Sequence, residues 1–225
     1  MHQPCLASEE IETRPNPDFS VIWLHGLGAD GHDFEPIVPE LNLPDDLALR
    51  FIFPHAPSIP VGINNGYIMP AWYDIQQNDL GIKQDEAGIR QSAKSIELLI
   101  ERERMRGIAS RRIILAGFSQ GGAMALHTGL RASERLGGII VLSAYLILPE
   151  TLKKEAHPSN RQTPIFMAHG VNDPIVPLRL GDAGHQQLLN HSYTVTWHSY
   201  PMKHSVCAEE IKVIGSWITK VLHDV

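Results

Sequence analysis

A serine held between two glycines is the residue of this chain with the clearest capacity for chemistry. Ser119 lies in Gly117-Phe118-Ser119-Gln120-Gly121, which follows an apolar run at 113–116 and precedes a helical pattern. The pattern is typical of a nucleophile elbow, a sharp turn that lifts the serine hydroxyl clear of a sheet at the start of a helix. Glycines avoid steric clash in such a turn, and a helix N-terminus favours a developing anion. We therefore predict a nucleophilic Ser119, with an ordinary glycine-rich turn as the alternative interpretation.

A serine hydroxyl needs a base in hydrogen-bond reach and a third group that orients the base. In hydrolases with a nucleophile elbow, an acid and then a histidine follow the serine along the chain. His204 lies in a loop between the last predicted strand and the last predicted helix, which is the place expected for the base. Asp173 follows the preceding predicted strand and is our candidate acid, whereas Asp182 is expected on a helix. The alternatives are a loop histidine without a role and an Asx turn before Pro174.

Acyl transfer also needs two backbone N–H groups for the oxyanion that forms on the attacked carbonyl. One is expected from Gln120, directly after the nucleophile, and the other from a loop after an early strand. The segment His25-Gly26-Leu27-Gly28-Ala29-Asp30-Gly31 follows an apolar run at 21–24, and its glycines let a substrate approach the backbone closely. We predict the N–H of Leu27 as the second donor, with a flexible glycine-rich turn as the alternative.

The elements that must position these residues alternate between strand and helix. Continuous apolar runs are typical of strands buried on both faces, and strands that alternate with helices form a mainly parallel sheet. We therefore predict one α/β domain over residues 1–225. The expected strands are 21–24, 49–53, 113–116, 139–142, 165–168 and 194–199, and the expected helices are 33–41, 85–105, 121–131, 178–190 and 208–222.

Two segments fit neither pattern. Residues 54–75 are rich in proline and glycine and predict a long irregular segment, which is either a binding loop or a surface connection. Residues 151–157 predict a short polar helix or loop.

The composition and charge limit which classes of partner the chain is expected to bind. The chain has 225 residues and a formal net charge of −6, with 43% hydrophobic and 20% charged residues, the balance of a soluble globular protein. Lysine and arginine form no cluster that suggests nucleic acid or an anionic membrane surface, so we expect no nucleic-acid partner and at most transient membrane contact. Two cysteines, Cys5 and Cys207, form no disulfide framework. Since the N-terminus does not resemble a secretory signal, we expect a cytoplasmic protein.

The motif search predicts no metal and no cofactor. The chain contains no His-Glu-x-x-His or Cys-x-x-Cys pair and no glycine-rich nucleotide loop. Cys207 lies three residues after His204, and we interpret it as a small thiol at the start of a helix rather than as a nucleophile.

Four motifs spread over most of the chain carry a family resemblance. They are His25-Gly26-Leu27-Gly28, Gly117-Phe118-Ser119-Gln120-Gly121-Gly122, Asn172-Asp173-Pro174-Ile175-Val176-Pro177 and Tyr200-Pro201-Met202-x-His204. Together they resemble the phospholipase/carboxylesterase family, which contains small bacterial carboxylesterases and eukaryotic acyl-protein thioesterases. Asn64-Asn65-Gly66-Tyr67 and Ala71-Trp72-Tyr73-Asp74 are similar to the substrate-side loop of that family.

The resemblance implies an α/β-hydrolase fold without a large lid domain. It implies a triad of Ser119, Asp173 and His204, with oxyanion donors at Leu27 and Gln120. It also implies a hydrophobic acyl groove near residues 63–75 and a homodimer in some members. The expected lining residues of the groove are Ile63, Trp72 and Tyr73.

One position departs from the family pattern, because the residue before the catalytic histidine is usually glycine and here is Lys203. The side chain either faces solvent or influences anionic substrates and His204.

We therefore predict a serine hydrolase that cleaves carboxylic esters of short to medium acyl chains. The alternative is a thioesterase or lysophospholipase that acts on long acyl chains, including acylated proteins. A hydrolase fold that only binds ligands is the remote alternative.

Overall fold

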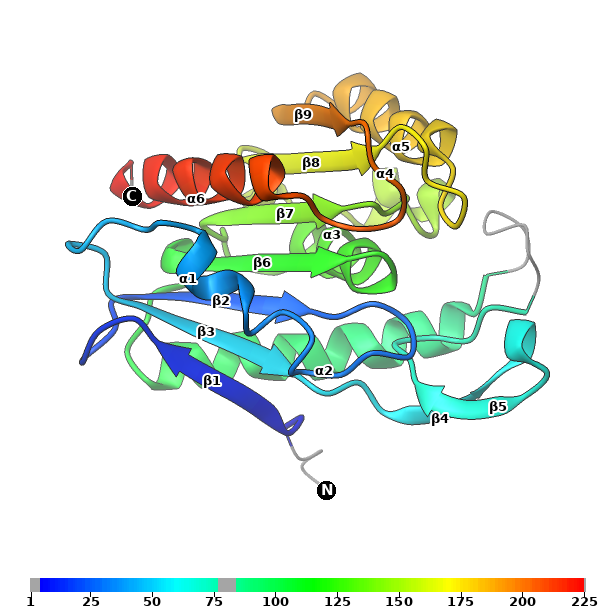
Figure 1. Cartoon of the computed structure of the whole chain (residues 1–225), viewed down its shortest axis with the longest axis horizontal. Helices are drawn as coiled ribbons and strands as arrows, with labels where there is room; N and C mark the ends of the chain where they lie inside the picture. The colour runs from blue at the N-terminus through cyan, green and yellow to red at the C-terminus, as the bar shows by residue number, and fades with distance from the viewer. Residues whose placement is uncertain (1–4, 77–83, 225) are drawn as a thin grey trace.

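A seven-stranded sheet forms the centre of the molecule in a computed structural model, which describes residues 5–76 and 84–224. The strand order is β1-β3-β2-β6-β7-β8-β9 (Figure 1). β1 pairs antiparallel with β3, and every other neighbouring pair in this sheet is parallel. The strands are β1 (Ser8–Glu12), β2 (Phe19–Leu24), β3 (Leu49–Pro54), β6 (Ile113–Phe118), β7 (Gly138–Leu142), β8 (Ile165–Gly170) and β9 (Val195–Tyr200).

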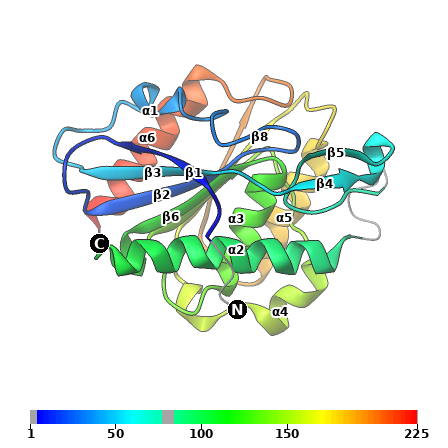
Figure 2. The same ribbon diagram turned by 90° about the horizontal axis from the view of Figure 1, so that it is seen from below.

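Helices cover both faces of this sheet. Figure 2 shows α1 (Ile37–Glu40) and α6 (Ala208–His223) on one face, with α2 (Glu86–Met105), α3 (Gln120–Arg131) and α5 (Leu178–Asn190) on the other. α4 (Leu152–Glu155) lies on the side of α2 and α5. Four short 3₁₀ helices complete the described elements: η1 (Gly62–Asn64), η2 (Ser110–Arg112), η3 (Pro149–Thr151) and η4 (Pro158–Asn160).

The double covering explains the continuous apolar runs. In β2, Val21 and Trp23 pack into the cluster under α1 and α6, while Ile22 and Leu24 pack into the cluster under α2 and α3. Successive side chains of a strand point to opposite faces, so a strand buried on both faces must be apolar at every position. The predicted α/β class with a mainly parallel sheet is confirmed.

The parallel strands all end at one edge of the sheet, where their loops meet. A two-stranded hairpin of β4 (Ser58–Val61) and β5 (Tyr67–Pro70) lies beyond this edge (Figure 1). The N–H of Gly28 donates to the carbonyl of Pro70 over 2.8 Å, which ties the hairpin to the loop after β2. The prediction of an irregular segment over 54–75 was therefore wrong in part, because Pro60 and Pro70 occupy edge positions in a strand pair that tolerates proline.

Other boundaries agree closely with the sequence. Asp85 caps α2 by accepting the N–H of Gly88 over 3.0 Å, and α5 spans the predicted residues. The helix expected over 33–41 is reduced to the four residues of α1, with Pro36 as its N-cap and Pro39 within its single turn. β1 has no counterpart in the prediction. None of the helices in the described ranges is long and apolar enough to cross a membrane.

Candidate active site

Ser119 occupies a strained turn between β6 and α3. Its backbone has φ 55° and ψ −121°, which a residue with a side chain rarely adopts, and such strain concentrates at functional sites. A Cβ at Gly117 would lie 2.3 Å from the backbone of Gly121, and one at Gly121 would lie 2.2 Å from the carbonyl oxygen of Leu24. Both positions therefore require glycine, because β6 packs against the first turn of α3 at Gly117 and that turn packs against the end of β2 at Gly121.

An unbroken chain of hydrogen bonds runs from Ser119 to Asp173. His204 Nε2 lies 2.9 Å from the Ser119 hydroxyl oxygen, and His204 Nδ1 lies 2.7 Å from Asp173 Oδ2. The three residues come from the ends of β6, β8 and β9, so the parallel sheet brings together positions that are 31 and 85 residues apart. The ring of His204 packs against Phe118, with centroids 4.7 Å apart. This contact limits rotation of the imidazole.

Asp173 is held in place by its own loop. Its Oδ1 accepts the N–H groups of Ile175 and Val176 over 2.8 and 2.9 Å, which leaves Oδ2 for His204. The buried ring of His169 donates from Nε2 to the carbonyl of Val176 over 2.8 Å. Burial lowers the pKa of His169, so its ring is neutral and serves as a fixed support. The Asx-turn interpretation and the triad interpretation of Asp173 are thus compatible, because different oxygens carry the two sets of bonds.

The loop after β2 approaches the elbow closely. A Cβ on Gly26 would lie 3.5 Å from the Cβ of Ser119. Among the described residues, the N–H groups of Leu27 and Gln120 donate to no backbone carbonyl. Gln120 is the first residue of α3, where N–H groups have no partner within the helix. The two N–H groups predicted as oxyanion donors are therefore available to a ligand.

An apolar cavity of about 430 Å³ opens at the nucleophile. Tyr73 and Tyr145 line it and share a hydrogen bond between their hydroxyls over 3.0 Å. Burial raises the pKa of Tyr145 to about 12, so the pair stays uncharged. The lining residues are Gly26, Leu27, Ala29, Asp33, Ile63, Tyr73, Ile75, Phe118, Ser119, Gln120, Tyr145, Pro174, Ile175, Val176 and His204.

A family model of known proteins matches nearly the whole chain. The family model described as Phospholipase/Carboxylesterase matches residues 7–222. The chain belongs to this family. By membership it is a hydrolase of carboxylic esters, as the motifs predicted.

Two named relatives and one solved structure are similar to this chain over most of its length. A protein of Neurospora crassa named Acyl-protein thioesterase 1 is 44% identical over 214 residues, covering 90% of this chain and 86% of its own. A protein of Gibberella zeae with the same name is 41% identical over 212 residues and 90% of each chain. Among solved structures, Arabidopsis thaliana SOBER1 has a TM-score of 0.86 and 31% identity, over 91% of this chain and 99% of that one.

The predicted lining residues of the esterase divide into two groups. Ile63 and Tyr73 line the cavity, as expected for the acyl groove. Trp72 is only 1% exposed and is absent from the cavity wall. Its indole N–H donates to the carbonyl of His25 over 2.9 Å. The structure therefore places Trp72 against the start of the loop after β2, which it supports.

The side chain of Gln120 makes two buried hydrogen bonds that the sequence analysis did not predict. Its Oε1 accepts the N–H of Trp72 over 2.8 Å, and its Nε2 donates to the carbonyl of Tyr73 over 2.7 Å. These bonds fasten the cavity wall to the residue that follows the nucleophile. The glutamine at the variable position of the Gly-x-Ser-x-Gly pattern is the one signal in the sequence that points to this clamp.

The sequence analysis treated His25 only as part of a motif, but its ring holds the start of the loop after β2 in place. The buried ring donates from Nδ1 to the carbonyl of Gly26 over 2.7 Å and accepts the N–H of Ala56 at Nε2 over 3.1 Å. Burial lowers the pKa of His25, which keeps the ring in the neutral form that these two bonds require. The ring thus joins the start of the loop to the end of β3.

The other residues discussed from the sequence lie outside the chain of hydrogen bonds. Lys203 is exposed. Cys207 is the N-cap of α6, and its N–H donates to Glu210 over 3.3 Å. Its position agrees with the expected thiol at the start of a helix.

Proposed function

We propose that this chain hydrolyses acyl thioesters and esters of medium to long chain length through a covalent acyl-enzyme on Ser119. The observation that carries the proposal is the hydrogen-bond chain from Ser119 through His204 to Asp173 at the mouth of an apolar cavity. A nucleophile, a base and an orienting acid in this order are the minimum for acyl transfer by a serine.

The first step is attack of the Ser119 hydroxyl oxygen on the carbonyl carbon. His204 Nε2 takes the hydroxyl proton as the new carbon–oxygen bond forms, and Asp173 stabilises the imidazolium that results. The negative charge on the carbonyl oxygen is stabilised by the N–H groups of Leu27 and Gln120, an effect of about 3 kcal/mol for each donor in comparable sites. His204 then returns its proton to the leaving oxygen or sulfur as the tetrahedral intermediate collapses.

Water completes the cycle. His204 removes a proton from the water as its oxygen attacks the acyl-enzyme, and the proton passes to Ser119 when the acid leaves. The acyl chain occupies the apolar cavity beside Ile63, Tyr73 and Val176 in this arrangement. A second cavity of about 430 Å³ shares His204 and Phe118 with the first and is suited to the leaving group, since His204 must reach the departing atom.

The length of the acyl chain follows from the volume. The acyl cavity, about 430 Å³, has roughly three times the volume of an engineered cavity of about 150 Å³ that holds benzene. It therefore has room for a chain on the order of a dozen carbons or more, which favours the long-chain alternative over short esters. The two fungal relatives named Acyl-protein thioesterase 1 support the same choice, and we propose long-chain acyl thioesters, including acylated proteins, as the substrate class.

Two experiments test the proposal. Intact-mass spectrometry after treatment with a fluorophosphonate should find one adduct on the wild type and on Ser216→Ala, a variant of an exposed helix serine, and none on Ser119→Ala. Initial rates on acyl thioesters of increasing chain length should give a kcat/KM that rises from butanoyl to dodecanoyl substrates. An adduct on Ser119→Ala would overturn the nucleophile, and a kcat/KM that falls with chain length would overturn the substrate class.

A further inference from the structure

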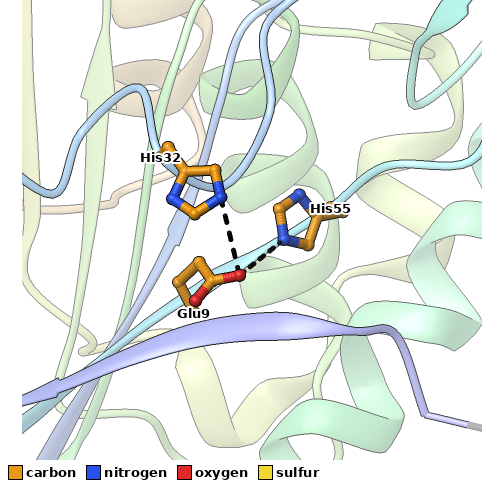
Figure 3. Close-up of side chains that lie close together, drawn as sticks. All are labelled: Glu9, His32 and His55. Atoms are coloured by element: carbon orange, nitrogen blue, oxygen red, sulfur yellow. Dashed lines mark hydrogen bonds and ion pairs between the residues drawn. The ribbon is translucent and has the colours of Figure 1, made fainter.

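Three side chains of types that bind metals, from separate segments of the chain, meet at the loop after β2. Glu9 lies on β1, His32 lies in the loop after β2, and His55 directly follows β3 (Figure 3). Glu9 Oε1 is 3.2 Å from His55 Nε2 and 3.7 Å from His32 Nε2. All three ligand atoms lie within 4.8 Å of one another.

We propose that these residues bind a zinc ion. Two imidazoles and one carboxylate form a ligand set that zinc prefers, with bonds of about 2.0–2.1 Å in a tetrahedron. The edge of such a tetrahedron is about 3.3 Å, since an edge is about 1.63 times the bond length. Glu9 Oε1 lies 3.2 and 3.7 Å from the two imidazole nitrogens, close to this edge. The two nitrogens lie within 4.8 Å of each other, so the ion needs side-chain shifts of up to about 1.5 Å to reach the tetrahedral edge. Water completes the fourth position.

A second carboxylate supports His32 in the way that zinc ligands require. His32 Nδ1 donates to Glu35 Oε1 over 2.7 Å, which leaves Nε2 directed at Glu9. Metal-ligating histidines commonly donate their other ring nitrogen to a carboxylate, which fixes the ring and raises its basicity as a ligand. The side chains of His32, Glu9 and His55 are 61%, 42% and 29% exposed, so an ion reaches them directly from solvent.

His55 connects the proposed zinc site to the loop after β2, which also contains Leu27. Its Nδ1 accepts the N–H of Gly31 over 3.1 Å, and its neighbour Ala56 donates to His25. Its Nε2 therefore carries the ring proton in this arrangement. Zinc replaces that proton at Nε2, and the neutral ring then holds its proton on Nδ1, where it opposes the Gly31 N–H. Binding thus costs the hydrogen bond between the Gly31 N–H and His55.

Isothermal titration with zinc sulfate tests the site on the intact protein. We expect one equivalent bound by the wild type, and affinity at least tenfold weaker in His32→Gln and in Glu9→Gln. Glu35→Gln should weaken binding by about tenfold, because loss of a supporting carboxylate costs about 10–100-fold. His223→Gln is the matched control, since exposed His223 pairs with Asp46 at 3.2 Å and has no third metal ligand among the described residues, and it should bind as the wild type does.

A spectroscopic titration with cobalt(II) chloride checks the geometry independently. The wild type should develop the intense visible absorption of four-coordinate cobalt, and His32→Gln should not. Zinc affinity that is unchanged in both His32→Gln and Glu9→Gln, or a weak six-coordinate cobalt spectrum in the wild type, would overturn the proposal. Such results would mean that the three residues only share hydrogen bonds. Circular dichroism of each variant verifies that a loss of binding does not reflect a loss of fold.

Discussion

The substitution Asp173→Asn tests the proposed chemistry most sharply, because the structure dictates how the new amide must face. The N–H groups of Ile175 and Val176 both donate to Asp173 Oδ1. An asparagine can satisfy these two donors only with its carbonyl oxygen. Its NH₂ group must then point at His204 Nδ1, 2.7 Å from the present Oδ2.

This orientation forces the wrong tautomer on the base. An NH₂ group donates to Nδ1, so the proton of the neutral ring moves to Nε2, which can then no longer accept the hydroxyl proton of Ser119. In serine hydrolases with the same constellation, the corresponding change lowers kcat by about 10⁴-fold. That loss corresponds to about 5.4 kcal/mol of transition-state stabilisation, at 1.36 kcal/mol for each factor of ten.

Steady-state hydrolysis of a chromogenic ester by Asp173→Asn measures the loss. Asp182→Asn is the matched control, because Asp182 is an exposed helix aspartate with a histidine 3.9 Å away, and it should retain wild-type kcat. Nitrogen-15 NMR of His204 should find the proton on Nε2 in Asp173→Asn and on Nδ1 in the wild type. A kcat reduced less than tenfold, or an unchanged tautomer, would refute the reasoning from the two backbone donors.

Three further changes test other parts of the structure. Gln120→Met leaves two buried backbone groups without partners, so we expect a loss of about 2–6 kcal/mol in urea unfolding at about 1–3 kcal/mol for each group, against less than about 0.5 kcal/mol for exposed Gln186→Met. Gly121→Ala places a Cβ 2.2 Å from the Leu24 carbonyl oxygen, and we expect urea unfolding to give a free energy of unfolding lowered by more than the about 1–3 kcal/mol of ordinary overpacking. Burial raises the pKa of Glu210 from 4.5 to about 7. The neutral carboxyl therefore stabilises the fold fully below pH 4.5, and that contribution, roughly 3 kcal/mol, is lost as the pH rises through 7. Glu210→Gln should abolish this pH dependence in unfolding at pH 5 and pH 8, and an identical pH dependence in both proteins would contradict the assignment.

The sheet was predictable wherever burial on both faces left a continuous apolar signature. The strands predicted over 113–116 and 165–168 lie within β6 and β8. Because these strands are parallel, the loops that follow them lie at the same edge of the sheet. β1 was not predicted from the sequence. Its five residues include three glutamates, so neither periodicity nor β-propensity identifies it as a strand. It is an edge strand that faces solvent, and its pairing with β3 is decided by tertiary contacts. The hairpin of β4 and β5 escaped because prolines within it are usually taken as evidence against strands.

The motifs identified Ser119, His204 and Asp173, which the structure joins by hydrogen bonds, since chemistry restricts which side chains can fill such positions. They did not reveal supports such as His25 and Trp72, because a support is defined by contacts across 31 and 47 residues of chain. Trp72 was expected at the cavity and lies against the start of the loop after β2, a distinction that no spacing rule contains. The homodimer stays a prediction.

Buried polar contacts hold the two segments that carry the proposed oxyanion donors. Leu27 belongs to a loop whose base is fixed by the ring of His25 and by the indole of Trp72, and Gln120 fastens the same Trp72 segment to the elbow. These bonds form one connected network, and a buried network that is fully satisfied holds a single geometry. Electrostatic stabilisation of an oxyanion requires donors that are already in position before charge develops. Loss of the Gln120 side chain should therefore lower kcat as well as stability, even though no atom of that side chain touches the reacting carbonyl.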